Sequence, residues 1–451
     1  MPDSVVPPPP LHPVYTDVLS VKVARGAFEQ VNTPAGKQRI LFIAEAATLA
    51  HVARPLVLSA ALDPGEFDIG FACDPRCQWL LRDFPGRYFP LPSMGSDHFL
   101  AALARGTPLY NEAILQRYVR DDLKLLDEVR PDAVIGDFRL SLSVSARLAG
   151  IPYLAISNCY WSPYWRPPRY TVPNLPLLTG ILPLPLADVL FQMARPVAFA
   201  LHCRPLNRVR RSHGLSSLGS DLRRVYTDAD HVLYADVPEL YPGATLPAHH
   251  HFIGPLVWSP PVPAPDWWGT IPSDRPIVYL TLGSSGQARL LPEILRSLAA
   301  LDITVIAATA GGKRPDAIPA NAFVAQYLPG EEAARRARLV ICNGGSPTSH
   351  QALAAGVLVI GIASNLDQFL NMGTIVRAGA GEIMRADRFS GAALARFVTK
   401  LLEETEYTTA ARKIAGVIAG YDGGSRFAAI VRSVLQKARP SAGEAGSRAR
   451  S

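Results

Sequence analysis

Two series of short apolar runs, each alternating with helical segments, constrain the fold of this chain more strongly than any other feature. The first series has runs at residues 39–44, 68–72, 133–137, 153–157, 228–234 and 251–254. The second series has runs at residues 277–282, 303–308, 323–325, 339–342 and 358–362. Between runs, segments such as residues 115–129 carry apolar residues at three- and four-residue intervals, the spacing of an amphipathic helix. Strands that alternate with helices form parallel sheets covered on both faces, so we predict an α/β protein.

A proline-rich segment lies between the two series. Proline lacks a backbone N–H and is excluded from the interior of helices and sheets, and residues 260–265 contain four prolines. We therefore predict a linker at residues 256–272, which separates an N-terminal domain of residues 37–255 from a C-terminal domain of residues 273–422. The length of 451 residues favours this division, because single cores rarely grow beyond about 250–300 residues.

The two ends of the chain differ in composition from the rest. Residues 1–36 are rich in proline and lack periodicity, and residues 439–451 consist mostly of glycine, alanine, serine and arginine. We predict that both are flexible. Residues 423–438, just before the tail, are predicted to form a C-terminal helix.

Composition excludes several classes of protein. The formal net charge is +7, but no RNA- or DNA-reading signature accompanies it, so we expect no nucleic-acid partner. No segment supplies about twenty uninterrupted apolar residues, so no transmembrane helix is predicted. The N-terminus lacks the basic start and apolar core of a signal peptide. Cys73 and Cys77 are the only closely spaced pair among the five cysteines, and no second pair completes a metal site. We expect a cytoplasmic protein without a metal.

The stretch that follows residues 339–342 has the composition of a phosphate-binding turn. An apolar strand ends at Asn343-Gly344-Gly345, and Ser346 is predicted to cap a helix whose first position is Pro347. Glycines let backbone amides approach a ligand closely, and a helix N-terminus carries about half a positive charge. An ordinary strand–turn–helix connection is the alternative interpretation of the same residues.

The spacing of further residues identifies a family. In order along the chain, the set is Asn343-Gly344-Gly345, Ala352-Leu353, Gly356, Asp367-Gln368 and Asn371. This ordered set resembles the inverting glycosyltransferases of the GT-B fold, glycosyltransferase family 1, which includes macrolide, plant-metabolite and rhamnolipid-type sugar transferases. The resemblance covers about residues 38–437. It implies two facing, doubly wound, Rossmann-like domains with a cleft between them, and a C-terminal helix that returns across the first domain.

The resemblance assigns the binding of a nucleotide-sugar donor to the second half. The residues implied to hold the donor diphosphate are Asn343, Gly344, Gly345, Ser346, Thr348, Gly283 and Ser284. Asp367 and Gln368 are implied to bind the sugar hydroxyls. Tyr327 and Gln351 are implied to contact the nucleoside, although Tyr327 is equally compatible with a place at the edge of the core. Asn343, Gln351 and Pro347 stand where the family usually has histidine, glutamate and glycine.

The first half is implied to hold the catalytic base. His51, in Ala50-His51-Val52-Ala53-Arg54-Pro55, matches the family's Gly-His motif after the first strand, with alanine in place of glycine. The base would take a proton from the acceptor hydroxyl, and imidazole suits this because its pKa is near neutral. Asp137 corresponds to the family's acidic partner of the base, and Asp97 is a weaker rival. A structural role for His51 and a helix-capping role for Asp137 are the alternatives.

An aromatic stretch is predicted to form the acceptor wall. It contains Tyr160, Trp161, Tyr164 and Trp165, and its alternative role is packing against the sheet. Such a wall indicates a hydrophobic acceptor, either a small natural product or a lipid, and peripheral contact with a membrane is a further expectation.

The resemblance therefore implies a single displacement with inversion at the anomeric carbon. The co-substrate would be a UDP- or dTDP-sugar, with no other cofactor and no metal, because a helix N-terminus and backbone amides would take the diphosphate charge. Two alternatives remain open. A UDP-sugar 2-epimerase shares the two-domain architecture but needs no acceptor wall, and a catalytically impaired relative would act as a partner protein.

Overall fold

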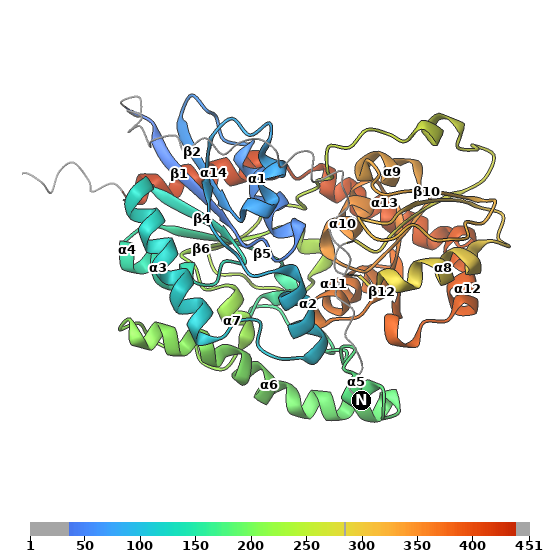
Figure 1. The fold of residues 1–451 in the computed structure, drawn as a ribbon, viewed down its shortest axis with the longest axis horizontal. Helices are drawn as coiled ribbons and strands as arrows, with labels where there is room; N and C mark the ends of the chain where they lie inside the picture. Colours follow the sequence, from blue (N-terminus) through green and yellow to red (C-terminus); the bar gives the residue numbers. More distant parts are fainter. Residues whose placement is uncertain (1–35, 284–285, 439–451) are drawn as a thin grey trace, which may run out of the picture. The chain divides into compact units, whose positions relative to one another are not determined.

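The computed structural model describes residues 36–283 and 286–438, and residues from Gln38 onward form one compact unit with two parallel sheets (Figure 1). The strands of the first sheet are β1 (Gln38–Ala44), β2 (Phe67–Cys73), β3 (Arg87–Pro90), β4 (Ala133–Asp137), β5 (Tyr153–Ser157), β6 (His231–Tyr234) and β7 (His250–Phe252). Their order is β3-β2-β1-β4-β5-β6-β7. The register pairs Ala44 with Asp137, so β1 and β4 end side by side.

The helices of this domain connect its strands. They are α1 (Leu49–Ser59), α2 (Ser96–Arg105), α3 (Glu112–Val129), α4 (Leu142–Ala149), α5 (Pro176–Thr179), α6 (Leu184–Ser212) and α7 (Leu222–Tyr226). In α3 the side chain of Asn111 accepts a hydrogen bond from the backbone N–H of Ile114, and the helix ends before Pro131, which disfavours helical geometry in the preceding residue. Figure 1 shows α6 along the lower edge of the domain.

The second sheet has the order β10-β9-β8-β11-β12-β13. Its strands are β8 (Ile277–Thr281), β9 (Thr304–Ala308), β10 (Ala322–Ala325), β11 (Leu339–Cys342), β12 (Leu358–Ala363) and β13 (Gly381–Arg385). The helices around it are α8 (Leu291–Leu298), α9 (Gly330–Arg336), α10 (Ser346–Ala354), α11 (Leu366–Arg377), α12 (Gly391–Glu403) and α13 (Thr405–Ala419). The predicted α/β class with two Rossmann-like sheets is confirmed.

The apolar pattern did not predict β3 and β13, two of the four edge strands, although it did predict the edge strands β7 and β10. Edge strands bury fewer side chains than central strands, so their sequences need no continuous apolar run. None of the four residues of β3 is fully buried, and only two of the five residues of β13, Gly381 and Met384, are buried.

The predicted linker joins the two sheets. Within residues 256–272 the short helix η5 (Asp266–Thr270) is the only regular element that the structure describes. Its Trp268 is buried, and the Trp268 indole N–H donates a hydrogen bond of 2.7 Å to the Glu332 side chain of α9. The later part of this segment therefore packs on the second domain.

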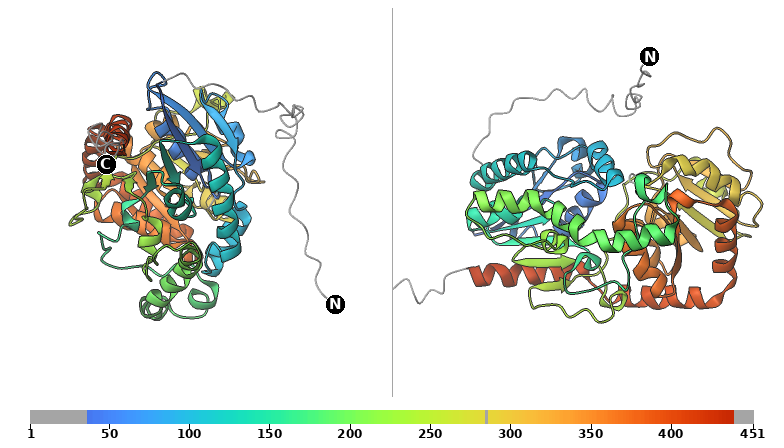
Figure 2. Two further views of the ribbon diagram at one scale, coloured as in Figure 1. Left: turned by 90° about the vertical axis from the view of Figure 1, so that its left-hand side faces the viewer. Right: turned by 90° about the horizontal axis from the view of Figure 1, so that it is seen from below.

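The C-terminal helix α14 (Gly423–Ala438) returns to the first domain (Figure 2). Phe427 is fully buried against Phe42 of β1, with ring centroids 6.0 Å apart. Arg432 forms an ion pair of 2.7 Å with Glu66 at the rim of this contact. The last helix thus ties the end of the chain to the first sheet.

We expect Phe427→Ala to lower the free energy of unfolding by about 3–5 kcal/mol, because it removes a buried aromatic ring and leaves a cavity. Chemical denaturation followed by circular dichroism measures the change. Arg432→Ala is the matched control on the same helix and should change stability little, because its ion pair is exposed. A small effect of Phe427→Ala would show that α14 does not unfold together with the first domain.

Candidate active site

The carboxyl ends of both sheets meet around one cavity of about 320 Å³. From the first domain, the start of α1, the turn after β4 and the segment after β5 contribute to the lining. From the second domain, the turns after β8 and β11 and the start of α11 contribute. Cavities of this size hold ligands of drug-like dimensions.

His51 lies in the first turn of α1 and is held by aromatic rings. Its imidazole stacks on Phe138, with ring centroids 4.7 Å apart and an angle of 21° between the planes, and it meets Phe99 edge-on at 6.5 Å. Its Nδ1 atom is buried and finds no hydrogen-bond partner in the part of the chain that the structure describes. Burial and the nearby positive charge of Arg54 lower the pKa of His51 to about 3. The imidazole is therefore neutral at pH 7 and able to accept a proton.

Asp137 ends β4, but its partner is not the histidine that the sequence analysis expected. Both carboxylate oxygens accept hydrogen bonds from Arg54, at 2.7 Å from Nε and 2.6 Å from Nη2. The hydrogen bond between His51 and Asp137 is not formed among the described residues. Burial raises the pKa of Asp137 to about 6 while Arg54 opposes the shift, so the carboxylate is ionised at pH 7. Asp137 therefore holds Arg54 rather than the imidazole.

The sequence contains an indication of the Arg54–Asp137 ion pair that the sequence analysis did not use. Arg54 lies three residues after His51 on a helix with an apolar face, where an arginine side chain needs a carboxylate partner if it is to be buried. The pairing of β1 with β4 places Asp137 at the right end of the sheet.

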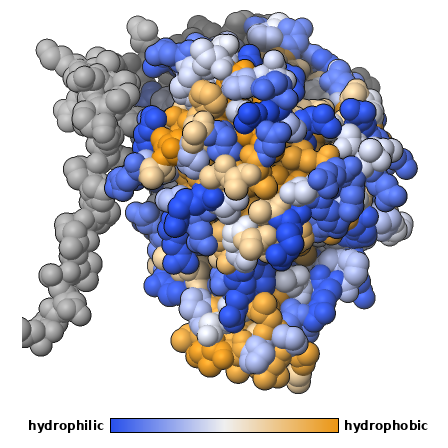
Figure 3. Space-filling view, turned by 90° about the vertical axis from the view of Figure 1, so that its right-hand side faces the viewer, coloured by the Kyte–Doolittle hydropathy of each residue, from blue (hydrophilic) through white to orange (hydrophobic). Residues whose placement is uncertain are grey.

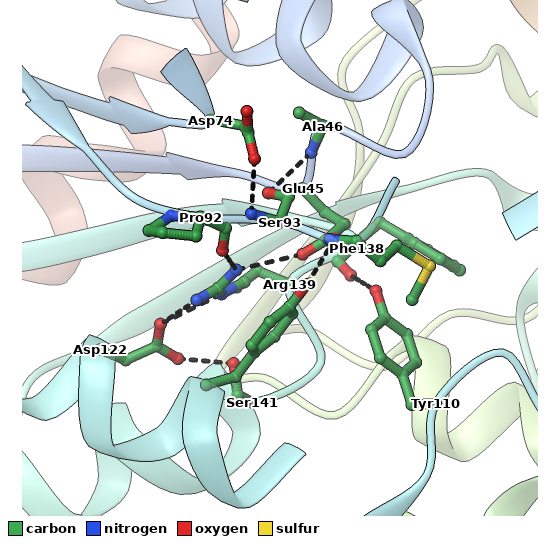
Figure 4. A network of polar contacts seen from close by, with 12 residues as sticks. Glu45, Ala46, Asp74, Pro92, Ser93, Tyr110, Asp122, Phe138, Arg139 and Ser141 are labelled. Atoms are coloured by element: carbon green, nitrogen blue, oxygen red, sulfur yellow. Dashed lines mark hydrogen bonds and ion pairs between the residues drawn. The ribbon is translucent and has the colours of Figure 1, made fainter. Parts of the chain in front are cut away.

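A buried ion network fixes the turn after β4 (Figure 4). The Arg139 side chain is completely buried and lies 3.2 Å from Glu45 of the β1 exit and 3.0 Å from Asp122 of α3. Its guanidinium also lies 3.6 Å from the ring centroid of Tyr118. Phe138, between Asp137 and Arg139 in sequence, has a φ of +58°, an uncommon value for a residue with a side chain. The network holds Phe138 in this conformation, in which its ring stacks on His51.

The turn after β11 has the glycines that the sequence analysis singled out. Gly344 has a φ of +81°, and a Cβ atom there would come within 2.8 Å of the Met372 side chain, so only glycine fits. The Asn343 side chain accepts a hydrogen bond of 3.0 Å from the Gly345 N–H. From α11, the Asn371 side chain donates a hydrogen bond of 2.8 Å to the Gly344 carbonyl. Asn343 and Asn371 thus shape the turn.

The helix after this turn begins one residue earlier than predicted. Gly345 is the capping residue and α10 starts at Ser346, so Ser346 does not cap the helix with its side chain. Gly345, Ser346 and Thr348 all line the cavity, which places the N-terminus of α10 in its wall. Gly283, with a φ of +61°, lines the same region after β8, and Ser284 lies outside the described residues.

A chain of polar contacts crosses the cavity between the domains. The Arg54 side chain that binds Asp137 also donates a hydrogen bond of 2.7 Å to the Asn158 side chain after β5. Asn158 in turn accepts a hydrogen bond of 3.5 Å from the Ser346 hydroxyl of α10. The first-domain residues Arg54 and Asn158 are therefore linked to the predicted diphosphate turn.

Asp367 and Gln368 both line the cavity at the start of α11. Asp367 accepts a hydrogen bond of 2.8 Å from the Trp161 indole N–H of the opposite domain. Burial raises the pKa of Asp367, and hydrogen bonds from Trp161 and Tyr160 oppose the shift. The Gln368 side-chain oxygen accepts hydrogen bonds from the Ser364 N–H at 2.8 Å and its hydroxyl at 3.0 Å. The side-chain oxygen of Gln368 therefore accepts hydrogen bonds from the residues that precede α11, whereas Asp367 faces the other domain.

The two residues predicted to contact the nucleoside lie together on the second-domain side. Tyr327 and Gln351 line the cavity with the linker residue Trp258. The Gln351 side-chain amide donates a hydrogen bond of 3.0 Å to the Trp258 carbonyl. Gln351 thus joins α10 to the linker.

The predicted aromatic wall divides into two pairs. Tyr160 and Trp161 line the cavity, but Tyr164 and Trp165 do not. Tyr164 is 45% exposed and meets His250 edge-on, and Trp165 is buried against Tyr241 with ring centroids 5.2 Å apart. The chain turns after η3 (Cys159–Trp161), so the later pair points away from the cavity.

Apolar residues from elements distant in sequence complete the wall instead. They are Phe99, Leu103, Leu109, Phe138, Leu140, Val225 and Tyr226. Phe99 and Leu103 have the i, i+4 spacing of one helix face, which was the only local sign of their role.

We expect the buried Arg54–Asp137 pair to be energetically coupled. Arg54→Met should lower the free energy of unfolding by about 3–5 kcal/mol, because it leaves a buried carboxylate without a counter-charge. The double variant R54M/D137N should lose less than the sum of the two single losses. Denaturant unfolding of all four proteins at pH 7 measures the coupling, and strictly additive losses would contradict the pair.

We expect the free energy of unfolding to decrease as the pH is lowered, partly because of His51. Between pH 6.5 and about 3 the unfolded imidazole binds a proton that the folded one does not, so the folded state loses stability as the pH falls. Relative to His51→Gln, the wild type should lose about 1–2 kcal/mol more between pH 7 and pH 5. Unfolding curves of both proteins at the two pH values test this, and parallel pH dependence would contradict it.

The sequence and fold match known proteins. Residues 292–420 match the family model described as "Erythromycin biosynthesis protein CIII-like, C-terminal domain". A PGL/p-HBAD biosynthesis glycosyltransferase of Mycobacterium tuberculosis strain H37Ra is 53% identical over 383 residues, which cover 84% of this chain and 89% of that protein. A PGL/p-HBAD biosynthesis rhamnosyltransferase of Mycobacterium bovis strain BCG is 52% identical over 381 residues, or 84% of each chain.

A solved structure extends the similarity to the fold. The spinosyn rhamnosyltransferase SpnG, complexed with thymidine diphosphate, matches with a TM-score of 0.61 at 18% identity. The match covers 88% of this chain and all of that chain. The fold is therefore GT-B, as the sequence analysis predicted.

Proposed function

Because the chain belongs to the family of PGL/p-HBAD biosynthesis glycosyltransferases, we propose that it moves a hexosyl group from a nucleoside-diphosphate sugar to a hydroxyl of an apolar or aromatic acceptor. The observation that carries the proposal is the shared cavity: His51, Gly345 at the start of α10 and Asp367 all line it. A base, a diphosphate cradle and a sugar-binding carboxylate are the groups that such a transfer needs.

The donor is a UDP- or dTDP-sugar, and two observations support dTDP with a deoxyhexose such as rhamnose. One relative is named a rhamnosyltransferase, and the structural neighbour SpnG is a rhamnosyltransferase in complex with thymidine diphosphate. The N-terminus of α10 would offset the diphosphate charge. No metal ion or further cofactor is part of the proposal.

In the proposed mechanism His51 takes the proton from the acceptor hydroxyl, which attacks the anomeric carbon while the nucleoside diphosphate leaves. The attack from the opposite face inverts the configuration. Stacking on Phe138 orients the imidazole, and Asp137 contributes through Arg54 and Asn158 rather than by touching His51.

The acceptor in this proposal is a phenol. A phenol has a pKa near 10, far below that of an aliphatic alcohol, so its proton is removed more easily. The negative charge of a bound donor would also raise the pKa of His51 toward neutrality. The aromatic and aliphatic lining of the first-domain side, including Phe99 and Tyr226, suits such an acceptor.

The test is a mass-spectrometric screen of UDP- and dTDP-sugars against a panel of phenols and hydrophobic alcohols. We expect a glycosylated phenol with release of the nucleoside diphosphate. His51→Ala should slow transfer by about 10²–10⁴-fold and leave donor binding in calorimetry unchanged. His98→Ala is the matched control, because His98 is exposed on α2 and does not line the cavity.

Other outcomes would identify the alternatives. Conversion of a UDP-sugar to its epimer without any acceptor would favour a UDP-sugar 2-epimerase. Donor binding without consumption across the whole panel would favour a catalytically impaired relative. If no nucleotide sugar is bound or consumed, the proposed function is wrong.

A further inference from the structure

Large hydrophobic side chains are exposed mainly on one surface. Among the described residues, eight of the ten such side chains lie on α5, on α6 or between the two helices. They are Leu177, Ile181, Leu186, Val189, Leu190, Met193, Val197 and Leu201. Leu177 is 87% exposed and Met193 is 73% exposed. We call these eight residues the α5–α6 surface, and Figure 3 shows an apolar area at the lower end of the molecule, where these helices lie.

Helix α6 is apolar on two faces. Its inner face, which includes Phe191, Phe199 and Leu206, is buried against the first domain. Its outer face carries Met193 and Val197 toward solvent, one helical turn apart. A surface helix of a soluble protein normally has a polar outer face, so the outer face of α6 is suited to an apolar environment.

The outer face becomes basic toward the end of the helix. The row continues from Leu201 to Arg204, Arg208 and Arg211, all exposed and spaced three or four residues apart, and Arg208 lies 3.7 Å from the Glu112 carboxylate of α3. Asp188 is the only acidic residue of α6, and its carboxylate is held by the Val172 N–H at 3.0 Å and by an ion pair with Arg169. An apolar stretch followed by exposed arginines complements a lipid surface with anionic headgroups.

The position of α6 fits a helix that lies on a membrane rather than across it. It is the one helix among the described residues that is long and apolar enough to span a bilayer, although the sequence analysis expected none. However, its inner face packs on the domain, Pro196 and Pro205 interrupt it, and its last turn carries arginines. An interfacial helix buries only one face, and α6 has only its outer face available.

The inner side of α6 adjoins the cavity wall that would receive the acceptor. A narrow cavity of about 20 Å³ is lined by His202 and Leu206 of α6 and by Leu109, Leu140 and Tyr226. The last three residues also line the main cavity. The C-terminal half of α6 therefore lies behind the acceptor side of the site, whereas α5 meets the second domain, where the Thr179 hydroxyl donates a hydrogen bond of 2.8 Å to Asp387.

We propose that the α5–α6 surface docks on an anionic lipid bilayer, with its hydrophobic side chains among the acyl chains and the arginines of α6 at the headgroups. Docking would bring the acceptor side of the cavity to a membrane that holds the acceptor. This last step rests on the proposed function, whereas the docking itself requires neither donor nor acceptor.

Co-sedimentation of the full chain with vesicles tests the docking. We expect binding to an equimolar mixture of phosphatidylcholine and phosphatidylglycerol, and weaker binding to phosphatidylcholine alone. Met193→Glu/Val197→Glu should reduce binding to the mixed vesicles by roughly tenfold or more. Leu148→Glu is the control. Leu148 is an exposed leucine on α4, outside the α5–α6 surface, so this variant should bind vesicles as the wild type does.

A second variant separates the charge from the apolar contact. Arg204→Ala/Arg211→Ala should remove most of the preference for anionic vesicles and most of the sensitivity to salt. The proposal is overturned if the wild type stays in the supernatant with both kinds of vesicle, or if Met193→Glu/Val197→Glu binds as the wild type does. Light scattering tests a further outcome. If the wild type is a dimer that binds no vesicles, and Met193→Glu/Val197→Glu is a monomer, the surface contacts a second copy of the chain and the proposal is overturned.

An enzyme assay distinguishes failure of the docking from failure of the proposed function. Met193→Glu/Val197→Glu should glycosylate a water-soluble phenol as the wild type does and should lose transfer only to an acceptor embedded in vesicles. Vesicle binding by a protein that transfers no sugar would support docking and contradict the proposed function. Transfer of sugar to the soluble phenol by a protein that binds no vesicles would support the proposed function and contradict docking.

Discussion

The ion network around Arg139 is the constraint on which the first-domain half of the site depends. A guanidinium group without any exposure must be paired, because burying an isolated charge costs far more free energy than a domain has to spare. Glu45 and Asp122 supply the pairing, and they come from the β1 exit and from α3. The turn after β4 is therefore held at both ends, with Arg139 in the network and Asp137 on Arg54. Between them, the Phe138 ring packs on Phe99, Tyr110 and Tyr226 and stacks on the imidazole.

The chemistry of the cavity is divided between two domains, and polar contacts join the halves. Asn158 of the first domain meets Ser346 at the start of α10, and Trp161 donates its indole N–H to Asp367. Each contact links a residue near the proposed base to a residue of the proposed donor site. A ligand that replaces these contacts would therefore alter both domains at once, which is how two-domain enzymes couple binding to closure.

Sequence reasoning succeeded where the determinant was local. The glycine turn after β11 was found because a positive φ and a close approach to Met372 leave glycine no substitute, and the central strands were found because burial on both faces requires continuous apolar runs. Sequence reasoning failed where the role of a residue depended on the direction in which its side chain points. Trp161 and Trp165 are four residues apart, yet one faces the cavity and the other the core. The edge strands β3 and β13 were not predicted, because neither contains a continuous apolar run.

The sequence by itself determined the α/β class, the two sheets, the glycine turn and the family to which the chain belongs, because periodicity and short motifs record local backbone geometry and burial. Only the tertiary structure decided that Asp137 binds Arg54 instead of His51, and that the outer face of α6 remains without a partner within the described residues. The physical reason is the same in both cases. The partner of a side chain and its exposure depend on which elements the fold brings together. These elements are distant in sequence, so local sequence patterns do not show which of them will be in contact.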